Sequence, residues 1–165
     1  MIKITLPDGS VKEFSKGTTP MEVAKSISEG LARNVISAKF DNTLIETVTP
    51  LVEDGKLVLY TWNDKEGKKA FWHSTSHVVA QALEELYPGV KLTIGPAIEN
   101  GFYYDVDLGE QTISEKDFPE IEKRALEIAR GKHEYKMRPV SKADALNLYK
   151  NQGNEYKVEL IENLE

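Results

Sequence analysis

The sequence predicts an α+β fold built in two parts, and three observations carry this prediction. Within residues 1–62, short stretches that alternate apolar and polar side chains are interrupted by a single helical pattern. The next seven residues, 63–69, contain no apolar side chain. Residues 70–165 then combine longer helical patterns with short strand patterns. We therefore expect a small domain at 1–62, a linker at 63–69 and a larger α+β domain at 70–165.

The first domain is expected to form a small mixed sheet around one helix. Two Asp-Gly pairs, Asp8 with Gly9 and Asp54 with Gly55, are typical of tight hairpin turns, and a further turn is expected at 41–42. Strand patterns stand at residues 2–6, 11–14, 35–40 and 56–61. Such a sheet packed on one helix is a β-grasp, or ubiquitin-like, arrangement, which by itself says little about function.

Several signals agree on where the helix of this domain begins. Thr19 suits the N-cap, Pro20 suits the first helical position, and Glu22 at the third position completes a capping box. Gly30 is expected to end the helix, because glycine readily adopts the backbone conformation that follows a helix C-terminus.

The second domain is expected to begin with a helix at 70–87, which Pro88 and Gly89 end. Asn100 and Gly101 predict a hairpin turn. The other expected elements are strands at 90–94, 102–106, 134–140 and 156–161, a helix from Ser114 or Asp117 to Arg130, and a helix at 141–149. The last strand is expected to lack neighbours and to present an exposed edge.

Composition excludes several classes of protein. The 165 residues contain no cysteine, which rules out disulfides and cysteine-ligated zinc within the chain. No apolar run approaches the roughly 20 residues that span a bilayer, and the N-terminus enters a strand pattern rather than a signal peptide. We therefore expect a soluble cytoplasmic protein with no membrane partner. The net charge of −6 argues against non-specific binding to DNA or RNA.

Basic residues nevertheless gather near the end of the chain. Between positions 123 and 138, six basic side chains stand against two acidic ones, Glu127 and Glu134. The basic residues are Lys123, Arg124, Arg130, Lys132, Lys136 and Arg138. Such a patch can contact phosphates in an otherwise acidic protein, and it can equally be the solvated surface of a helix end and a strand. The sequence alone leaves both interpretations open.

The most chemically specific feature is the pair His73 and His77, in a chain with only three histidines. Positions four apart lie one above the other on a helix, so both imidazoles are expected to point at one spot. Such a pair forms half of a metal site or half of a polar catalytic pocket. Ser74 stands where zinc-protease helices carry their general-base glutamate, which excludes that motif. Zinc needs three or four ligands, and His133 lies far along the chain, so the other half of such a site is expected beyond Glu165 or in a partner.

The segment 95–105 is a second candidate. Gly95 and Pro96 shape a loop that a ligand can approach closely, although a tight hairpin and an aromatic core strand explain the same residues. Composition alone makes this a weak signal, and Lys157 is singled out only by the resemblance described next.

Two parts of the sequence together resemble one family of enzymes. Residues 1–62 resemble the TGS domain found at the N-terminus of threonyl-tRNA synthetases and in some GTPases and stringent-response enzymes. The motif His73-x-x-x-His77, followed by Gly95-Pro96 and by the segment 100–105, resembles the editing domain shared by threonyl- and alanyl-tRNA synthetases. A TGS domain followed by an editing domain is the threonyl pattern, and the match covers the whole chain.

The resemblance implies a role in proofreading. Threonine and serine differ by one methyl group, which is worth only about 1–3 kcal/mol in a binding pocket, so a second site must hydrolyse Ser-tRNA(Thr). By similarity, His73 and His77 position the attacking water and the terminal ribose. Lys157 is implied to hold a phosphate or to stabilise negative charge on the ester oxygen.

The resemblance also implies that most of the enzyme lies outside these 165 residues. The family's Cys-x-x-x-His motif, its class II catalytic core and its anticodon domain do not occur in this sequence. We therefore expect the chain to be a monomeric N-terminal region with an incomplete editing domain, inactive by itself. Because editing in threonyl relatives need not use a metal, the resemblance also implies no metal and no cofactor in this chain. The parent threonine–tRNA ligase is expected to be a homodimer that binds tRNA(Thr) and uses ATP, magnesium and zinc in the absent core.

Two other functions remain open. In the first, the chain is a TGS-containing module that binds RNA or a partner, without catalysis and with a structural histidine pair. In the second, it is a free-standing editing hydrolase, against which the missing cysteine counts. Hydrolysis of Ser-tRNA distinguishes an enzyme from a module that only binds tRNA.

Overall fold

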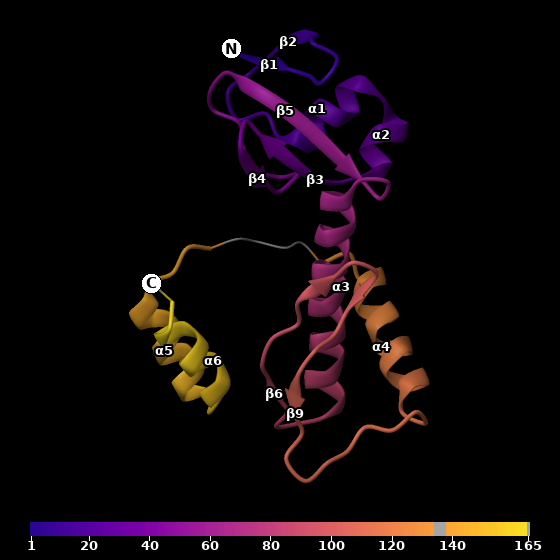
Figure 1. Ribbon diagram of the computed structural model, residues 1–165, viewed down its shortest axis with the longest axis vertical. Helices are drawn as coiled ribbons and strands as arrows, with labels where there is room; N and C mark the ends of the chain where they lie inside the picture. The colour runs from indigo at the N-terminus through magenta and orange to yellow at the C-terminus, as the bar shows by residue number, and fades with distance from the viewer. Residues whose placement is uncertain (134–137, 165) are drawn as a thin grey trace. The chain divides into compact units, whose positions relative to one another are not determined.

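The computed structural model describes residues 1–133 and 138–164 (Figure 1). Its contacts divide the chain into two units, Met1–Trp72 and His73–Glu165, each with its own internal packing. The division of the chain into domains by a linker at 63–69 stays a prediction. Among the described residues, the helices are all too short or too polar to cross a membrane.

The first unit is built on a mixed five-stranded sheet with strand order β2-β1-β5-β3-β4. The strands are β1 (Ile2–Thr5), β2 (Val11–Phe14), β3 (Val35–Phe40), β4 (Thr43–Ile45) and β5 (Gly55–Thr61). β1 and β5 pair in parallel, while the other neighbours are antiparallel. The β-grasp-like arrangement expected from the sequence is therefore present, with the short β4 as an added edge strand.

Helix α1 (Pro20–Ile27) begins as the capping signals predict. The Glu22 backbone N–H donates to Thr19 Oγ1 at 3.3 Å, and the Thr19 backbone N–H donates to the Glu22 carboxylate at 2.8 Å. The expected stop at Gly30 is wrong. Ser28 caps a second helix, α2 (Glu29–Asn34), by accepting from the Leu31 N–H at 3.0 Å, so Gly30 lies inside that helix.

Apolar side chains from the sheet, α1 and one loop form the core of this unit. Its buried members are Ile2, Ile4, Val23, Ala38, Leu51 and Leu57. Leu51 belongs to the loop between β4 and β5, which backbone hydrogen bonds to Gly17 and Thr18 hold in place. Because β5 pairs with β1 and β3 rather than with β4, this loop is a crossover. The hairpin turn expected at Asp54 and Gly55 is therefore wrong.

Helix α3 (Lys65–Leu86) begins five residues before the expected start. The Asp64 carboxylate accepts from the Thr61 backbone N–H at 2.7 Å and from the Thr61 hydroxyl at 3.0 Å, and the Asp64 carbonyl accepts from the Lys68 N–H at 2.9 Å. Most of the polar stretch 63–69 is thus helical. Lysine and glutamate favour helices, so the absence of apolar side chains there reflects exposure rather than irregular backbone.

The second unit also contains the rest of α3, two small ribbons and three further helices. β6 (Lys91–Leu92) pairs with β9 (Val106–Asp107), and β7 (Ala97–Ile98) pairs with β8 (Gly101–Phe102). The strands are shorter than expected, because residues 93–96 and 103–105 lie outside the ladders. Helix α4 (Phe118–Arg130) has the expected extent, starting after Asp117.

The chain ends in a helical pair, α5 (Lys142–Asn151) and α6 (Glu155–Glu162), whose helices contact each other (Figure 1). Ser141 caps α5 as predicted, accepting from the Asp144 N–H at 3.1 Å. The strand expected at 156–161 is wrong, and so is its exposed edge. Of the strand expected at 134–140, residues 134–137 lie outside the described residues and 138–140 form no regular element.

The side chains of this last segment fit both a strand pattern and a helical pattern, and the segment forms a helix. Tyr156, Val158 and Leu160 alternate as in a strand, but Val158 and Ile161, three apart, are more buried than Tyr156 and Leu160. Asn154 also supplies a helix cap, accepting from the Lys157 N–H at 3.1 Å.

We predict that Gly67→Ala destabilises the chain. Gly67 is buried in the first turn of α3, and a Cβ added there would overlap the Thr61 carbonyl oxygen. Overpacking of this kind costs about 1–3 kcal/mol in the free energy of unfolding, measured by urea denaturation followed by circular dichroism.

Gly30→Ala is the matched control. Gly30 also lies in a helix, but a Cβ there meets only Ser28 Oγ, at 3.8 Å. We expect this change to stabilise the chain by about 0.5–1 kcal/mol. Equal effects of the two substitutions would show that the close approach at Gly67 carries no constraint.

Candidate functional site

The two imidazoles expected to converge on α3 do so. His73 and His77 are both exposed, their Nε2 atoms lie 3.2 Å apart, and their rings are nearly perpendicular with centroids 4.7 Å apart. At this distance one nitrogen donates a proton and the other accepts it, so the pair shares a single N–H between these two atoms. Each ring then keeps its Nδ1 for a ligand, as an acceptor on the ring that donates and as an N–H donor on the ring that accepts.

The surroundings of His77 favour its neutral form. Loss of water contact lowers the pKa of the His77 imidazole, and the charges of His73 and of Lys157 lower it further. A neutral imidazole can accept a proton from water near pH 7, which is what a general base requires. Lys157, eighty positions further along the chain, therefore contributes to the lowered pKa of His77.

Lys157 is half-buried, and this partial burial lowers the pKa of its ammonium group, while the nearby Glu84 carboxylate opposes the shift. Glu84 lies on α3, seven positions after His77. Because Lys157 is half-buried, its ammonium group has less water around it than a lysine at an open surface. That arrangement suits stabilisation of negative charge on a substrate.

Three contacts attach α6, and Lys157 with it, to the β6–β9 ribbon. The Asn154 side-chain amide donates to the Leu92 carbonyl at 3.1 Å, and Lys91 pairs with Glu155 at 3.3 Å. The Tyr156 hydroxyl donates to the Asp107 carboxylate at 3.0 Å, which lowers the pKa of that carboxyl together with the Gly109 N–H. Lys157 thus approaches the histidines from a helix, not from the strand expected from the sequence.

Ser76 links the histidine helix to the second candidate segment, and the sequence analysis did not single it out. Its side chain is 1% exposed, and its hydroxyl lies 2.7 Å from the His73 carbonyl oxygen and 3.1 Å from the Gly95 carbonyl oxygen, both acceptors. The signal available in the sequence was a serine three positions after one histidine and one before the other. Such a serine can bond back to the preceding turn.

Gly95 is also the place where the Tyr104 ring packs against the loop. A Cβ at Gly95 would overlap the Tyr104 ring, so only glycine allows this packing. Burial raises the pKa of the Tyr104 hydroxyl, with smaller contributions from Glu84 and Tyr149. Segment 95–105 therefore lies against the helix of the histidine pair, as one joined structure.

The residues present do not make a metal site. In the part of the chain that the structure describes, no group of three or more histidine, aspartate or glutamate side chains is placed to hold a metal ion. His133 follows α4, where its ring lies over Gly131. The basic patch of α4 is partly engaged, since Arg124 forms ion pairs with Glu85 and with Glu127.

The first unit matches a known family model. The model described as "TGS domain" matches residues 2–61, which covers the five-stranded sheet with α1 and α2. Residues 2–61 are a TGS domain. This confirms the resemblance that the first 62 residues carry.

Curated relatives match the whole chain. A threonine–tRNA ligase of Flavobacterium johnsoniae is 74% identical over 165 residues, and one of Flavobacterium psychrophilum is 73% identical over the same length. A threonine–tRNA ligase of Cytophaga hutchinsonii is 52% identical over 164 residues. The chain corresponds to the N-terminal region of these proteins, and it spans only 25% of their length.

We predict that Ser76→Ala destabilises the second unit. Removing the hydroxyl leaves the Gly95 carbonyl without its donor, at a cost of about 1 kcal/mol in the free energy of unfolding. Amide hydrogen exchange in the segment 95–105 should speed up in the variant. Ser74→Ala, an exposed serine on the same helix, is the control and should change neither quantity appreciably. Equal exchange rates in both variants would contradict the link.

We predict that Lys157→Gln raises the pKa of His77. The lysine cation disfavours a second positive charge on the imidazole, so its removal lets His77 take up a proton at higher pH. An NMR titration of the His77 ring proton measures the shift. Lys116→Gln removes an exposed lysine of the same unit and should leave that pKa unchanged. An unchanged or lowered His77 pKa in Lys157→Gln would show that the two side chains do not interact.

Proposed function

We propose that this chain is the N-terminal region of a threonine–tRNA ligase and contributes to the hydrolysis of tRNA(Thr) mischarged with serine. The observation that carries the proposal is the hydrogen-bonded imidazole pair of His73 and His77, together with the charge of the half-buried Lys157, which lowers the pKa of His77. Because the relatives are named threonine–tRNA ligases, the proposal takes tRNA(Thr) as the nucleic acid and threonine as the correct amino acid.

The chemistry of the proposal is the hydrolysis of an ester. Water adds to the ester carbonyl carbon, the bond to the ribose oxygen breaks, and the proton from water passes to that oxygen. His77, held neutral by its surroundings, donates its Nε2–H to His73 and takes the proton from the water at its free Nδ1, while the remaining N–H of His73 orients the ribose. Lys157 stabilises the negative charge that develops on the carbonyl oxygen.

Binding alone cannot separate the two amino acids well enough. A methyl group is worth about 1–3 kcal/mol, or roughly 10- to 200-fold, so a separate hydrolytic site adds the missing discrimination. In this proposal the Gly95 loop, held by Ser76 and covered by Tyr104, forms one wall of that site. Further groups of the site come from residues outside these 165.

The remaining activity of the parent enzyme is also part of the proposal. Joining threonine to tRNA(Thr) with ATP, in a class II core that holds magnesium and zinc, takes place in the other three quarters of the protein. The parent is proposed to act as a cytoplasmic homodimer, with tRNA(Thr) as its partner. None of the described residues is assigned to these steps.

A second candidate function rests on the TGS match. Because TGS domains occur outside ligases as well, the chain as a whole could serve to bind RNA or a partner, with the histidine pair in a structural role. An assay of Ser-tRNA(Thr) deacylation separates the two functions, because a binding module retains tRNA without hydrolysing the ester.

We predict that His73→Ala in the full-length protein slows the deacylation of Ser-tRNA(Thr) by about 100-fold or more, because an acid–base group of this kind contributes about 10²–10⁴ in rate. Activation of threonine, measured by pyrophosphate exchange, should be unchanged. His133→Ala is the matched control, because it removes the one histidine outside the pair. Unchanged deacylation in His73→Ala, with correct folding, would exclude the proposed role.

A further inference from the structure

Asn154 lies at a junction of three elements in the second unit, and the proposed hydrolysis assigns it no role. Its backbone N–H donates to the Tyr149 carbonyl of α5 at 3.0 Å. Its side-chain Nδ2 donates to the Leu92 carbonyl of β6 at 3.1 Å, and its Oδ1 accepts from the Lys157 backbone N–H of α6 at 3.1 Å. One residue therefore connects α5, α6 and β6.

The two side-chain bonds of Asn154 come from the two ends of one amide group. An amide is planar and short, so a carbonyl bound at one end and an N–H bound at the other are held at a nearly fixed separation. Asn154 is half-buried, so both bonds are partly shielded from competing water. The first turn of α6 is thereby held to β6 at the level of Lys157.

The residue held in this way carries the cation of the candidate site. The ammonium group of Lys157 lies at the end of a flexible four-carbon stem, so the region it can reach depends on where its backbone is anchored. The titratable side chains coupled to it by charge, His77 and Glu84, belong to α3. The position of α6 therefore relates Lys157 to side chains of another helix.

The two residues that follow Asn154 also contact the β6–β9 ribbon, but their contacts are more exposed. The Glu155 side chain is 84% exposed, so water and salt weaken its ion pair with Lys91. Tyr156 is 38% exposed, and its hydroxyl bond to Asp107 is open to water as well. Asn154 differs from both because it bonds directly to the backbone of the lysine.

We propose that Asn154 is a positioning residue, which fixes the place of the Lys157 ammonium group relative to the histidine pair. It acts by bonding the Leu92 carbonyl with one end of its amide and the Lys157 N–H with the other. The catalytic meaning of this role rests on the proposed function, in which Lys157 stabilises negative charge on the ester. The anchoring itself does not depend on that function and can be measured without a substrate.

Asn154→Ser separates the two side-chain bonds. Serine and asparagine are similarly good helix N-caps, so α6 should keep its start, but the single hydroxyl of serine cannot also reach the Leu92 carbonyl. The charge of Lys157 lowers the pKa of His77, and a lysine released from its anchor spreads over more positions. We therefore expect the pKa of His77 to rise, by less than in Lys157→Gln, in an NMR titration of the 165-residue chain.

The double variant tests whether Asn154 acts through the lysine. Asn154→Ser combined with Lys157→Gln should give His77 the same pKa as Lys157→Gln alone, because a positioning residue has no effect once the group that it positions is gone. A further rise in the double variant would show a general change in the packing around His77, and would overturn the proposal.

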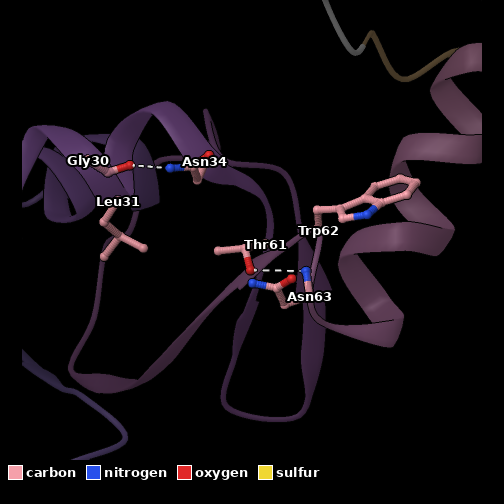
Figure 2. Close-up of a pocket in the computed structure, with 6 residues that line it drawn as sticks. All are labelled: Gly30, Leu31, Asn34, Thr61, Trp62 and Asn63. Atoms are coloured by element: carbon pink, nitrogen blue, oxygen red, sulfur yellow. Dashed lines mark hydrogen bonds between the residues drawn. The ribbon is translucent and has the colours of Figure 1, made fainter.

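Asn34→Ser is the matched control. Asn34 lines the open hollow between α2 and the end of β5, and its Nδ2 donates to the Gly30 carbonyl at 2.7 Å (Figure 2). The substitution therefore also removes a bond from an asparagine amide to a backbone carbonyl, but in the other unit. The pKa of His77 should stay unchanged, and circular dichroism should show that both variants keep their helices. An equal rise in this control would overturn the proposal.

Kinetics of the full-length protein give a second measurement. A displacement of about 1 Å in a positioned group can cost about 10²-fold in rate, so we expect Asn154→Ser to lower kcat for Ser-tRNA(Thr) deacylation about tenfold or more, with little change in KM. The low-pH limb of the rate profile should move to higher pH, together with the pKa of His77. Neither effect should add to that of Lys157→Gln. A fall in rate without a shift of that limb would show a merely structural role.

The positioning role and the proposed function can fail separately. An unchanged or lowered pKa of His77 in Asn154→Ser, or in Lys157→Gln, would overturn the positioning role, while His73→Ala still tests the hydrolysis. Unchanged deacylation in His73→Ala would exclude the hydrolysis, and the NMR titrations of the single and double variants would still decide whether Asn154 holds Lys157.

Discussion

The close approach of α3 to the end of β5 is the constraint on which the rest of the structure depends. Gly67 has no side chain, so the first turn of the helix lies directly on the Thr61 carbonyl, and the Asp64 carboxylate bonds back to Thr61. This contact determines where α3 starts and how it leaves the sheet. Because an α-helix turns by about 100° per residue, His73 and His77, four positions apart, share one face of it.

The chemistry of α3 follows from that regular spacing. Its first turns carry Lys68 beside the Trp62 ring, and later turns carry His73, Ser76 and His77. Each group does something different in its own surroundings. Ser76 is buried and bonds to a neighbouring loop, whereas the two histidines remain exposed and bond to each other. One helix thus supplies a buried link to a loop and an exposed, hydrogen-bonded pair of imidazoles within five residues.

Local signals in the sequence were reliable where one interaction decides the structure. The capping box at Thr19 and Glu22, the cap at Ser141 and the spacing of His73 and His77 are all found as expected. They failed where two patterns compete. Gly30 can end a helix, but Ser28 starts a new one there, and the alternation of Tyr156, Val158 and Leu160 yields to the helix that Asn154 caps.

The sequence by itself determined the strands and helix of the β-grasp-like sheet and the facing histidine pair, because these follow from residue patterns within single elements. It also carried the resemblance to threonyl-tRNA synthetases, which the relatives confirm. Only the tertiary structure decided which distant residues meet. Ser76 reaches Gly95 and the charge of Lys157 reaches His77 because separate elements pack together, and the sequence spacing of such residues says nothing about their distance in space.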